Sequence, residues 1–213
     1  MRKVKFAPNE YYHIYNRGND KKPIFTDQND YIRFLFLILH FQGNNPFYNI
    51  GRQVACFVKH RVFNIEKPAI NEILKKRVME LVTFSLMPNH FHLLLHEHTE
   101  SGISKYMQRV LDAYTKYFNT KYKKNGHLFQ GPFNAVYIET NEQLLHLSSY
   151  IHRNSHELSE WTDKEHLYPW SSYIDYIQKN RWGELLSSHK ILEQFSEPEE
   201  YREFVDTSGI KER

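Results

Sequence analysis

Two apolar runs joined by a two-residue turn constrain the fold of this chain most strongly. Residues 79–87 read MELVTFSLM and residues 90–97 read HFHLLLHE, with Pro88 and Asn89 between them. In the first run, large apolar residues recur at every second position, which is the period of a β-strand. Proline and asparagine are typical turn residues. The sequence therefore predicts two successive strands joined by a tight turn.

Patterns on either side of this hairpin predict further elements. Residues 10–16 and 133–139 read as strands. Capping residues followed by apolar residues at helical spacing predict three helices: from Thr26 or Asp27 to about Gln42, from about Ser101 to Lys123, and from Thr140 or Asn141 to Asn154. Residues 54–65 (VACFVKHRVFNI) are harder to interpret, and they fit one or two strands or an inserted loop.

The resulting order of elements is strand, helix, insertion, strand, strand, helix, strand, helix. This order predicts an α+β fold of the ferredoxin-like, split βαβ type, in which an antiparallel sheet carries helices on one face. We expect a main domain over residues 1–160, with residues 43–76 as an insertion, followed by a C-terminal helical extension over residues 161–213. An apolar fraction of 40% is enough for a hydrophobic core.

Several classes of protein are excluded. The single cysteine, Cys56, excludes a disulfide framework and a cysteine-rich zinc site. The first twelve residues have no apolar signal region, and no later run approaches the ~18 apolar residues of a membrane span. No glycine-rich phosphate loop is visible, so no nucleotide cofactor is expected. We expect a cytoplasmic protein with no membrane partner.

The positive charge is concentrated although the net charge is only +3. Six basic residues fall in one predicted helix: Lys105, Arg109, Lys116, Lys121, Lys123 and Lys124. A local basic face suits a polyanionic partner, although an ordinary solvated helix face explains the same pattern equally well. The chain also holds 15 Tyr, 15 Phe and 3 Trp. Aromatic rings among basic residues suit unstacked bases, but core packing accounts for most of them.

Two histidines stand at the start of the second hairpin strand. Because strand side chains alternate, His90 and His92 project from one face while Phe91 packs into the other. Two imidazoles side by side on a rigid strand can serve as a pair of metal ligands. The alternative is that they are polar residues on an exposed sheet face.

A second pattern lies near the end of the helix that precedes residue 155. Tyr150 and Asn154 are four residues apart, so they share one face of that helix. The amide oxygen of asparagine is a hard ligand that, together with imidazole, suits Mg²⁺ or Mn²⁺. The alternative for the tyrosine is a core residue at helical spacing.

Five segments, taken together and in this order, resemble the single-tyrosine HUH transposases. Within that family the resemblance is nearest to the REP-associated tyrosine transposases. The segments are YNRGN (15–19), SLMPNHFHLLL (85–95), GHLFQG (126–131), YIHRN (150–154) and PWSSY (169–173). The resemblance implies an HUH endonuclease fold. It also implies an enzyme that cleaves and rejoins single-stranded, hairpin-bearing DNA through a 5′-phosphotyrosine.

The resemblance implies a role for each matching residue. His90, His92 and Asn154 would hold the divalent metal, Mg²⁺ or Mn²⁺, and Tyr150 would be the catalytic nucleophile. Tyr114 and Tyr117 are rival nucleophiles by residue type alone. The candidate DNA contacts are Arg17, Lys105, Arg109, Lys116 and Gln130.

Two other functions remain open at this point. One is a domesticated module that binds hairpin DNA without cutting it, and the other is a nickase of the replication-initiator type. The oligomeric state is open as well. A monomer with its site in cis and a homodimer with its site in trans both occur among the proteins that this chain resembles.

Overall fold

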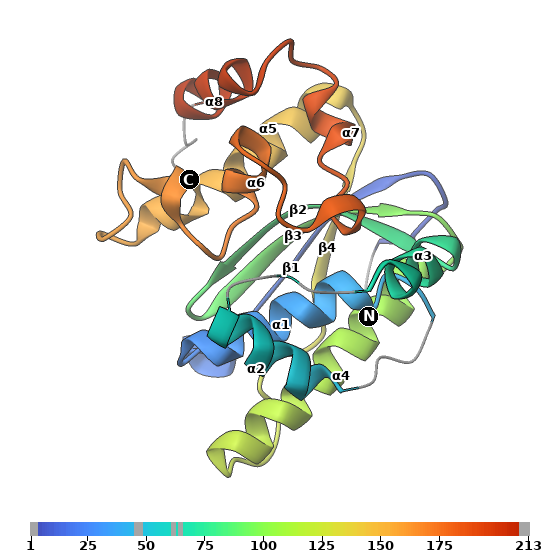
Figure 1. The fold of residues 1–213 in the computed structure, drawn as a ribbon, viewed down its shortest axis with the longest axis vertical. Coiled ribbons are helices and arrows are strands. Elements are labelled where there is room, and N and C mark those ends of the chain that lie inside the picture. Colours follow the sequence, from blue (N-terminus) through green and yellow to red (C-terminus); the bar gives the residue numbers. More distant parts are fainter. Residues whose placement is uncertain (1–3, 45–48, 61–62, 64–65, 209–213) are drawn as a thin grey trace.

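Four strands form a single antiparallel sheet in the computed structural model, which describes residues 4–44, 49–60, 63 and 66–208 (Figure 1). The strands are β1 (Tyr11–Arg17), β2 (Met79–Met87), β3 (His90–Glu97) and β4 (Asn134–Ile138). Their order in the sheet is β2-β3-β1-β4. With its helices, this arrangement is the predicted α+β fold of the split βαβ type.

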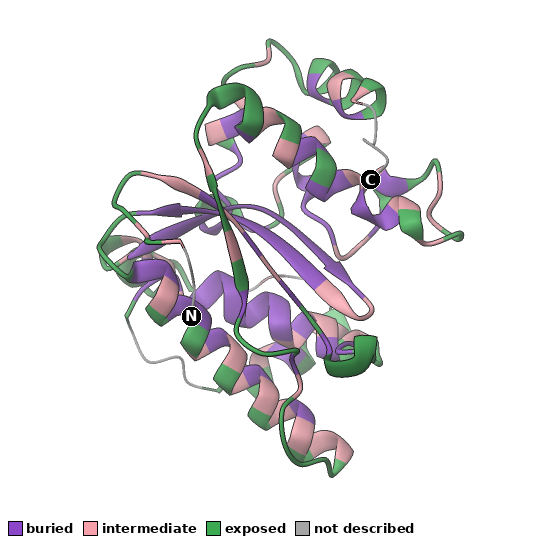
Figure 2. Ribbon diagram, turned by 180° about the vertical axis from the view of Figure 1, so that it is seen from behind, coloured by how far each residue is buried: buried purple, intermediate pink, exposed green. Residues whose placement is uncertain are grey.

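The pairing of the strands fixes which side chains meet. The predicted hairpin is formed by β2 and β3, with Ser85 opposite His92. Strand β1 lies on the other side of β3, where Tyr15 is opposite His92 and Arg17 is opposite His90. Strand β3 is thus an inner strand with neighbours on both sides. Its residues are held more rigidly than those of an edge strand such as β4, which is largely exposed (Figure 2).

Two helices cover one face of the sheet, as the sequence predicts. They are α1 (Gln28–His40) and α4 (Gly102–Tyr122). Asp27 caps the start of α1. Its carboxylate accepts from the backbone N–H of Asp30, and the carboxylate of Asp30 accepts in return from the backbone N–H of Asp27. This reciprocal cap explains why the helix starts where the sequence indicates. Against the sheet, Phe34 packs on Phe91 with ring centroids 5.0 Å apart.

The opposite face of the sheet is covered as well, which the expectation of helices on one face did not include. Helix α5 (Asn141–Arg153) and the C-terminal extension lie over it (Figure 1). All nine residues of β2 are buried. A strand buried on both faces needs a cover on each side, because apolar side chains on an open face would stay in contact with water.

The insertion between α1 and β2 is helical. It contains α2 (Ile50–His60) and α3 (Lys67–Lys75), so both interpretations of this stretch, strands or an inserted loop, were wrong for residues 54–60. Val54 packs with Ile32 and Phe36 on the side of α1 that faces away from the sheet. Val54, Phe57 and Val58 follow helical spacing, but a run this short fits a buried strand equally well. Residues 61–62 and 64–65 lie outside the described residues.

The C-terminal extension consists of short helical pieces, as predicted. After η2 (Asn154–Glu157), which directly follows α5, they are η3 (Glu165–Leu167), α6 (Tyr173–Ile177), η4 (Gly183–Leu185), α7 (His189–Leu192) and α8 (Pro198–Thr207). Tyr173, Tyr176 and Tyr201 are buried in the same core as the sheet. They surround His152 of α5, whose ring contacts the Tyr201 hydroxyl and Ser172. Burial lowers the pKa of His152 to about 3, so this histidine is a neutral core residue.

A short 3₁₀ segment, η1 (Asn19–Lys21), follows β1 and lies against the β2–β3 turn. Among the residues that the structure describes, no helix is both long and apolar enough to cross a membrane.

Candidate active site

The two strand histidines lie on the face of the sheet that α5 covers. Their ring centroids are 5.1 Å apart and the ring planes are perpendicular. Between them, Phe91 points to the other face and is fully buried. The alternation predicted from the sequence is therefore present, and the two imidazoles stand side by side at one end of an inner strand.

Helix α5 brings the other two predicted residues to these histidines. The amide oxygen of Asn154 lies 3.0 Å from Nε2 of His90. The Tyr150 ring lies 5.5 Å from the His92 ring, edge to face. Tyr150 is 46% exposed, whereas its helix neighbours Ile151 and His152 are fully buried and anchor α5. All four predicted residues thus come together within one chain, and the tyrosine remains accessible from outside.

The contacts of His90 fit a bound cation. Nδ1 of His90 lies 2.7 Å from the side-chain oxygen of Asn89, and Nε2 lies 3.0 Å from the side-chain oxygen of Asn154, so an acceptor faces each ring nitrogen. A neutral imidazole carries a proton on only one nitrogen, so one of these two contacts sets a lone pair against an oxygen. Two acceptors at this distance repel unless a cation lies between them. Burial lowers the pKa of His90 and disfavours the imidazolium, so the pair suits a metal ion.

His13 is a residue of the site that sequence reasoning missed. Its Nε2 lies 2.8 Å from Nδ1 of His92, and the two rings are stacked. Because this contact uses Nδ1 of His92, the other ring nitrogen, Nε2, is the one that can bind a metal ion. Burial first, and then the nearby His13 and His90, lower the pKa of His92 well below its ordinary value, so His92 is neutral and able to ligate a metal. The available signal was the two-residue spacing of His13, Tyr15 and Arg17 in β1.

Replacing His13 by alanine is expected to raise the dissociation constant for Mn²⁺ about 10- to 100-fold. A partner that orients a ligating histidine typically has an effect of this size. Calorimetric titration of Mn²⁺ measures it. His146→Ala is the matched control, because His146 is an exposed histidine on α5. Equal affinities in the wild type and His13→Ala would exclude the orienting role.

The rival tyrosines lie on the other side of the sheet. Tyr114 is fully buried and its hydroxyl donates to the carbonyl of Ile24 at 2.6 Å. The hydroxyl of Tyr117 donates to Asp30 at 3.0 Å. Burial raises the pKa of Tyr114 well above its ordinary value, and burial with the charge of Asp30 raises that of Tyr117 to about 12. Both hydroxyls are engaged within the fold and are poorly suited to ionise.

Two of the five candidate DNA contacts lie beside the histidines. Arg17 is opposite His90 in the sheet, and its Nε donates to the side-chain oxygen of Gln130. Both side chains are exposed. The other three candidates are on α4, across the sheet from the site. Of these, Arg109 donates to the carbonyl of Gly43 at 2.7 Å and stacks over Phe41, so its charge is used within the fold.

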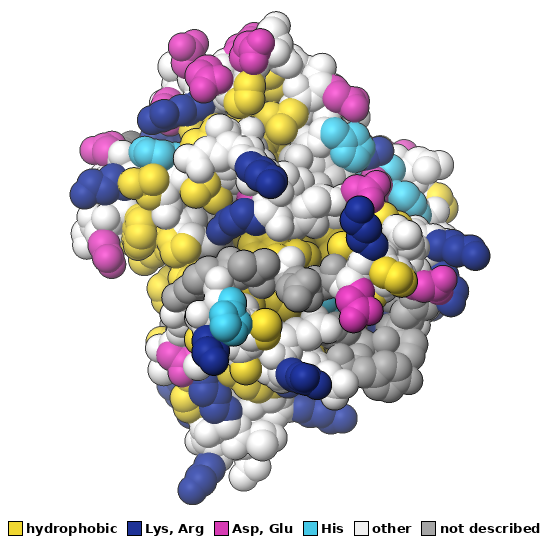
Figure 3. All heavy atoms as spheres, in the orientation of Figure 1, with side chains coloured by type: hydrophobic (Ala, Val, Ile, Leu, Met, Phe, Trp, Pro, Cys, Tyr) yellow, Lys and Arg dark blue, Asp and Glu magenta, His cyan; other side chains and the backbone are white. Residues whose placement is uncertain are grey.

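The surface charge is not evenly distributed. Acidic side chains gather at the end that carries α8, whereas basic ones are spread over the visible face and include the end with α4 (Figure 3). There, Lys116, Lys123 and Lys124 line a shallow pocket of about 550 Å³. Lys121 of the same helix is paired with Asp27 and Asp30 instead. The end of α4 is therefore a basic surface, although it holds fewer available cations than the sequence alone indicates.

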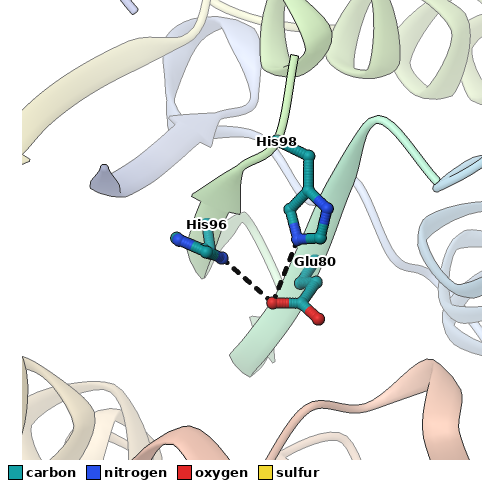
Figure 4. A group of neighbouring side chains, drawn as sticks. All are labelled: Glu80, His96 and His98. Carbon is teal, nitrogen blue, oxygen red and sulfur yellow. Dashed lines mark hydrogen bonds and ion pairs between the residues drawn. The ribbon is translucent and has the colours of Figure 1, made fainter. Parts of the chain in front are cut away.

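A second group of histidines surrounds Glu80, away from the first (Figure 4). One carboxylate oxygen of Glu80 lies 3.0 Å from His96 and 3.2 Å from His98. Two histidines and a carboxylate are a common metal-ligand set. Here, however, Arg77 and Lys190 also lie on this carboxylate, at 3.2 and 3.4 Å. Their two positive charges disfavour a divalent ion, and we interpret the group as a charged link between the sheet and α7.

Glu80→Gln is expected to lower the free energy of unfolding by about 3 kcal/mol at neutral pH, because Arg77 is left buried without its partner. Urea unfolding measures it. Glu72→Gln, in an exposed pair with Lys76, is the matched control and should cost less than about 1 kcal/mol. Equal losses in the two variants would contradict this role for Glu80.

The contribution of Glu80 should also depend on pH. Burial alone would raise the pKa of this carboxyl, but hydrogen bonds from His96 and His98 and the charge of Lys190 outweigh it and hold the pKa below 4.5, its ordinary value. A carboxyl with a lowered pKa in the folded state stabilises the fold above its ordinary pKa and loses that effect at lower pH. The difference between wild type and Glu80→Gln should therefore shrink as the pH falls below 4.5.

The sequence matches one family model, described as Transposase IS200 like, over residues 52–154. The matched segment begins in α2 and ends at Asn154, so it includes His90, His92 and Tyr150. A search of the curated proteins finds no match.

A solved structure of a REP-associated tyrosine transposase bound to a REP hairpin is similar to this chain. The two chains are 13% identical, and the match covers 85% of this chain and 86% of the other, with a TM-score of 0.55. At this identity the similarity shows a shared fold. Together with the family match, it confirms the resemblance seen in the sequence.

Proposed function

Because residues 52–154 carry the sequence signature of the IS200-like transposases, we propose that this protein is a DNA strand transferase acting on single-stranded, hairpin-bearing DNA. It cleaves and rejoins the strand through a 5′-phosphotyrosine on Tyr150. One observation carries the proposal: the exposed Tyr150 stands against His92, next to the pair formed by His90 and Asn154. A nucleophile and three ligands suited to a hard cation meet in one place.

His90, His92 and Asn154 would hold the divalent ion, Mg²⁺ or Mn²⁺. When bound, the ion offsets the negative charge of the phosphodiester oxygens, which otherwise repel a nucleophile. The protein keeps both imidazoles neutral by burial and orients them through Asn89 and His13. These contacts would hold each ring in a fixed orientation toward the ion.

The chemical step is a transesterification. The Tyr150 hydroxyl loses its proton and its oxygen bonds to phosphorus, while the bond from phosphorus to the 3′ oxygen breaks. The 3′ oxygen takes up a proton and leaves as a hydroxyl. The 5′ end of the other fragment stays linked to Tyr150. Because the phosphoester link is retained, a 3′-hydroxyl can attack it and restore the strand without ATP.

The expected substrate is DNA that carries a hairpin, as in the complex of the structurally similar transposase. Arg17 and Gln130, beside the histidines, would contact the strand near the scissile phosphate. Lys105 and Lys116 are exposed on α4 and would contact phosphates further away. Arg109, already engaged with Gly43 and Phe41, would contribute least.

The site is assembled within one chain, which supports cleavage in cis. Tyr150 contacts the rings of His13 and His92 of its own chain. We therefore expect the tyrosine and the candidate metal ligands of one subunit to act together, whether or not the protein forms a homodimer.

The proposal is tested with labelled hairpin DNA carrying single-stranded flanks, incubated with the protein and Mg²⁺, Mn²⁺ or a chelator. We expect a nick and a protein-linked 5′ end with either ion and neither product with the chelator. Salt-sensitive binding without cleavage in any condition would instead support a hairpin-binding module. Cleavage without dependence on the hairpin would support a nickase of the replication-initiator type.

A further inference from the structure

A pocket with aromatic walls opens beside the β2–β3 turn, and the chemistry above does not use it. Its volume is about 420 Å³. Its walls come from Tyr31 of α1, Pro88 of the turn, and Trp161, Tyr168 and Trp170 of the C-terminal extension. Glu160 is the one charged residue among those that line it.

The aromatic walls are fixed in position. Trp170 stacks on Tyr31, with centroids 4.6 Å apart and planes 12° apart. Trp161 meets Tyr168 edge to face at 5.4 Å. The hydroxyl of Tyr168 donates to the carbonyl of Leu86 in β2 at 2.7 Å. Trp161 and Trp170 are only partly buried, unlike the fully buried Trp182, so each keeps some ring surface exposed.

The pocket lies next to the candidate active site. Pro88 is two residues before His90, and Leu158, which also lines the pocket, is four residues after Asn154. The same turn contacts η1, because Asn89 donates to the carbonyl of Lys21. The exposed Lys21 and Lys22 therefore lie close to the turn. Aromatic walls and the positive charge of Lys21 therefore lie close in sequence to the candidate ligands His90 and Asn154, whereas Lys22 is paired with Asp20.

We propose that this pocket binds one unstacked nucleobase of the DNA strand held at Tyr150, and the inference rests on the proposed function. Aromatic side chains stack well on bases, and each such contact contributes measurably to binding of single strands. A pocket of this size takes one base rather than a duplex. Glu160 favours a base that offers an exocyclic amino group, such as cytosine or adenine.

Binding to full-length Tyr150→Phe protein tests the inference without cleavage. A set of hairpin DNAs is used, each with one abasic site at a different position of the single-stranded flank. We expect one abasic position to weaken binding about 10-fold, the size of one lost base contact. In protein that also carries Trp161→Ala, intact DNA should bind about 10-fold more weakly and that abasic position should have no further effect. Tyr137→Ala, an exposed aromatic on β4, is the matched control.

Trp170→Phe, which keeps an aromatic ring, separates stacking from folding and should retain the sensitivity to the abasic site. The inference is overturned if every abasic DNA binds like the intact one, or if Trp161→Ala leaves the affinity unchanged. Either result would leave adduct formation by the wild type unaffected. Conversely, suppose that one abasic position weakens binding but the wild-type protein forms no adduct. This result would support base binding in the pocket and contradict the proposed function.

Discussion

Replacing Tyr150 by phenylalanine is expected to abolish the covalent protein–DNA adduct and to lower strand cleavage at least about a thousandfold, because the hydroxyl that would supply the attacking oxygen is removed. The hydroxyl of Tyr150 is the only group removed. Since the side chain is 46% exposed, its loss should not disturb the core. Binding of hairpin DNA should stay within about twofold of wild type. Labelled DNA on a denaturing gel measures the adduct.

The matched controls for this variant are Tyr114→Phe and Tyr117→Phe. Both remove a hydroxyl that is hydrogen-bonded on the other face of the sheet. They should lower stability slightly, by about 1 kcal/mol each, and leave the adduct intact. An adduct that survives in Tyr150→Phe and disappears in either control would assign the nucleophile to α4 instead.

Replacing His90 or His92 by alanine is expected to remove the stimulation of cleavage by Mn²⁺ and to slow cleavage by on the order of a thousandfold. A Lewis-acid ion supplies several kcal/mol to a reaction of this kind. Mn²⁺ binding, measured by calorimetry, should fall in parallel. Asn154→Ala should also weaken Mn²⁺ binding and slow cleavage, but by a smaller factor, because one of three ligands is lost and water can replace it.

His96→Ala provides the comparison for the metal ligands. His96 is on the same strand and is about as buried as His92, but it contacts Glu80 and His98 rather than the candidate ligands. Its replacement should leave Mn²⁺ binding unchanged. If His96→Ala lost the Mn²⁺ that His90→Ala retained, the ion would belong to the Glu80 group and the assignment of ligands would be wrong.

Local signals explain how much of the fold could be predicted. The alternation in residues 79–87, the turn at Pro88 and Asn89, and the caps at Asp27 and Thr140 depend on nearby residues, and the structure contains each of them. The helix α2 was not predicted, because its short apolar run fits a strand or a helix. The packing of the C-terminal extension over the second face of the sheet was not predicted either. It depends on contacts between β2 and residues about 90 positions later, such as Tyr176.

The parts of the site that depend on residues close together in the sequence could be predicted. His90 and His92 share a face of the sheet because successive side chains of a strand point to opposite faces. Tyr150 and Asn154 share a face of α5 because residues four apart are about one helical turn apart. His13 could not be placed beside His92 without knowing that β1 pairs with β3. Likewise, the sequence counts Arg109 and Lys121 as available cations. The structure engages Arg109 with Gly43 and Lys121 with Asp27, through contacts between segments far apart in the chain.

Peptide mapping of the DNA-linked protein tests the central claim most directly. Wild-type protein is reacted with hairpin DNA and Mn²⁺, the DNA is digested to a short remnant, and the modified peptide is sequenced by mass spectrometry. We predict a nucleotide attached through phosphate to the side-chain oxygen of Tyr150, at its 5′ end. Attachment to Tyr15, Tyr114 or Tyr117, or cleavage that leaves no attached nucleotide on any tyrosine, would contradict it.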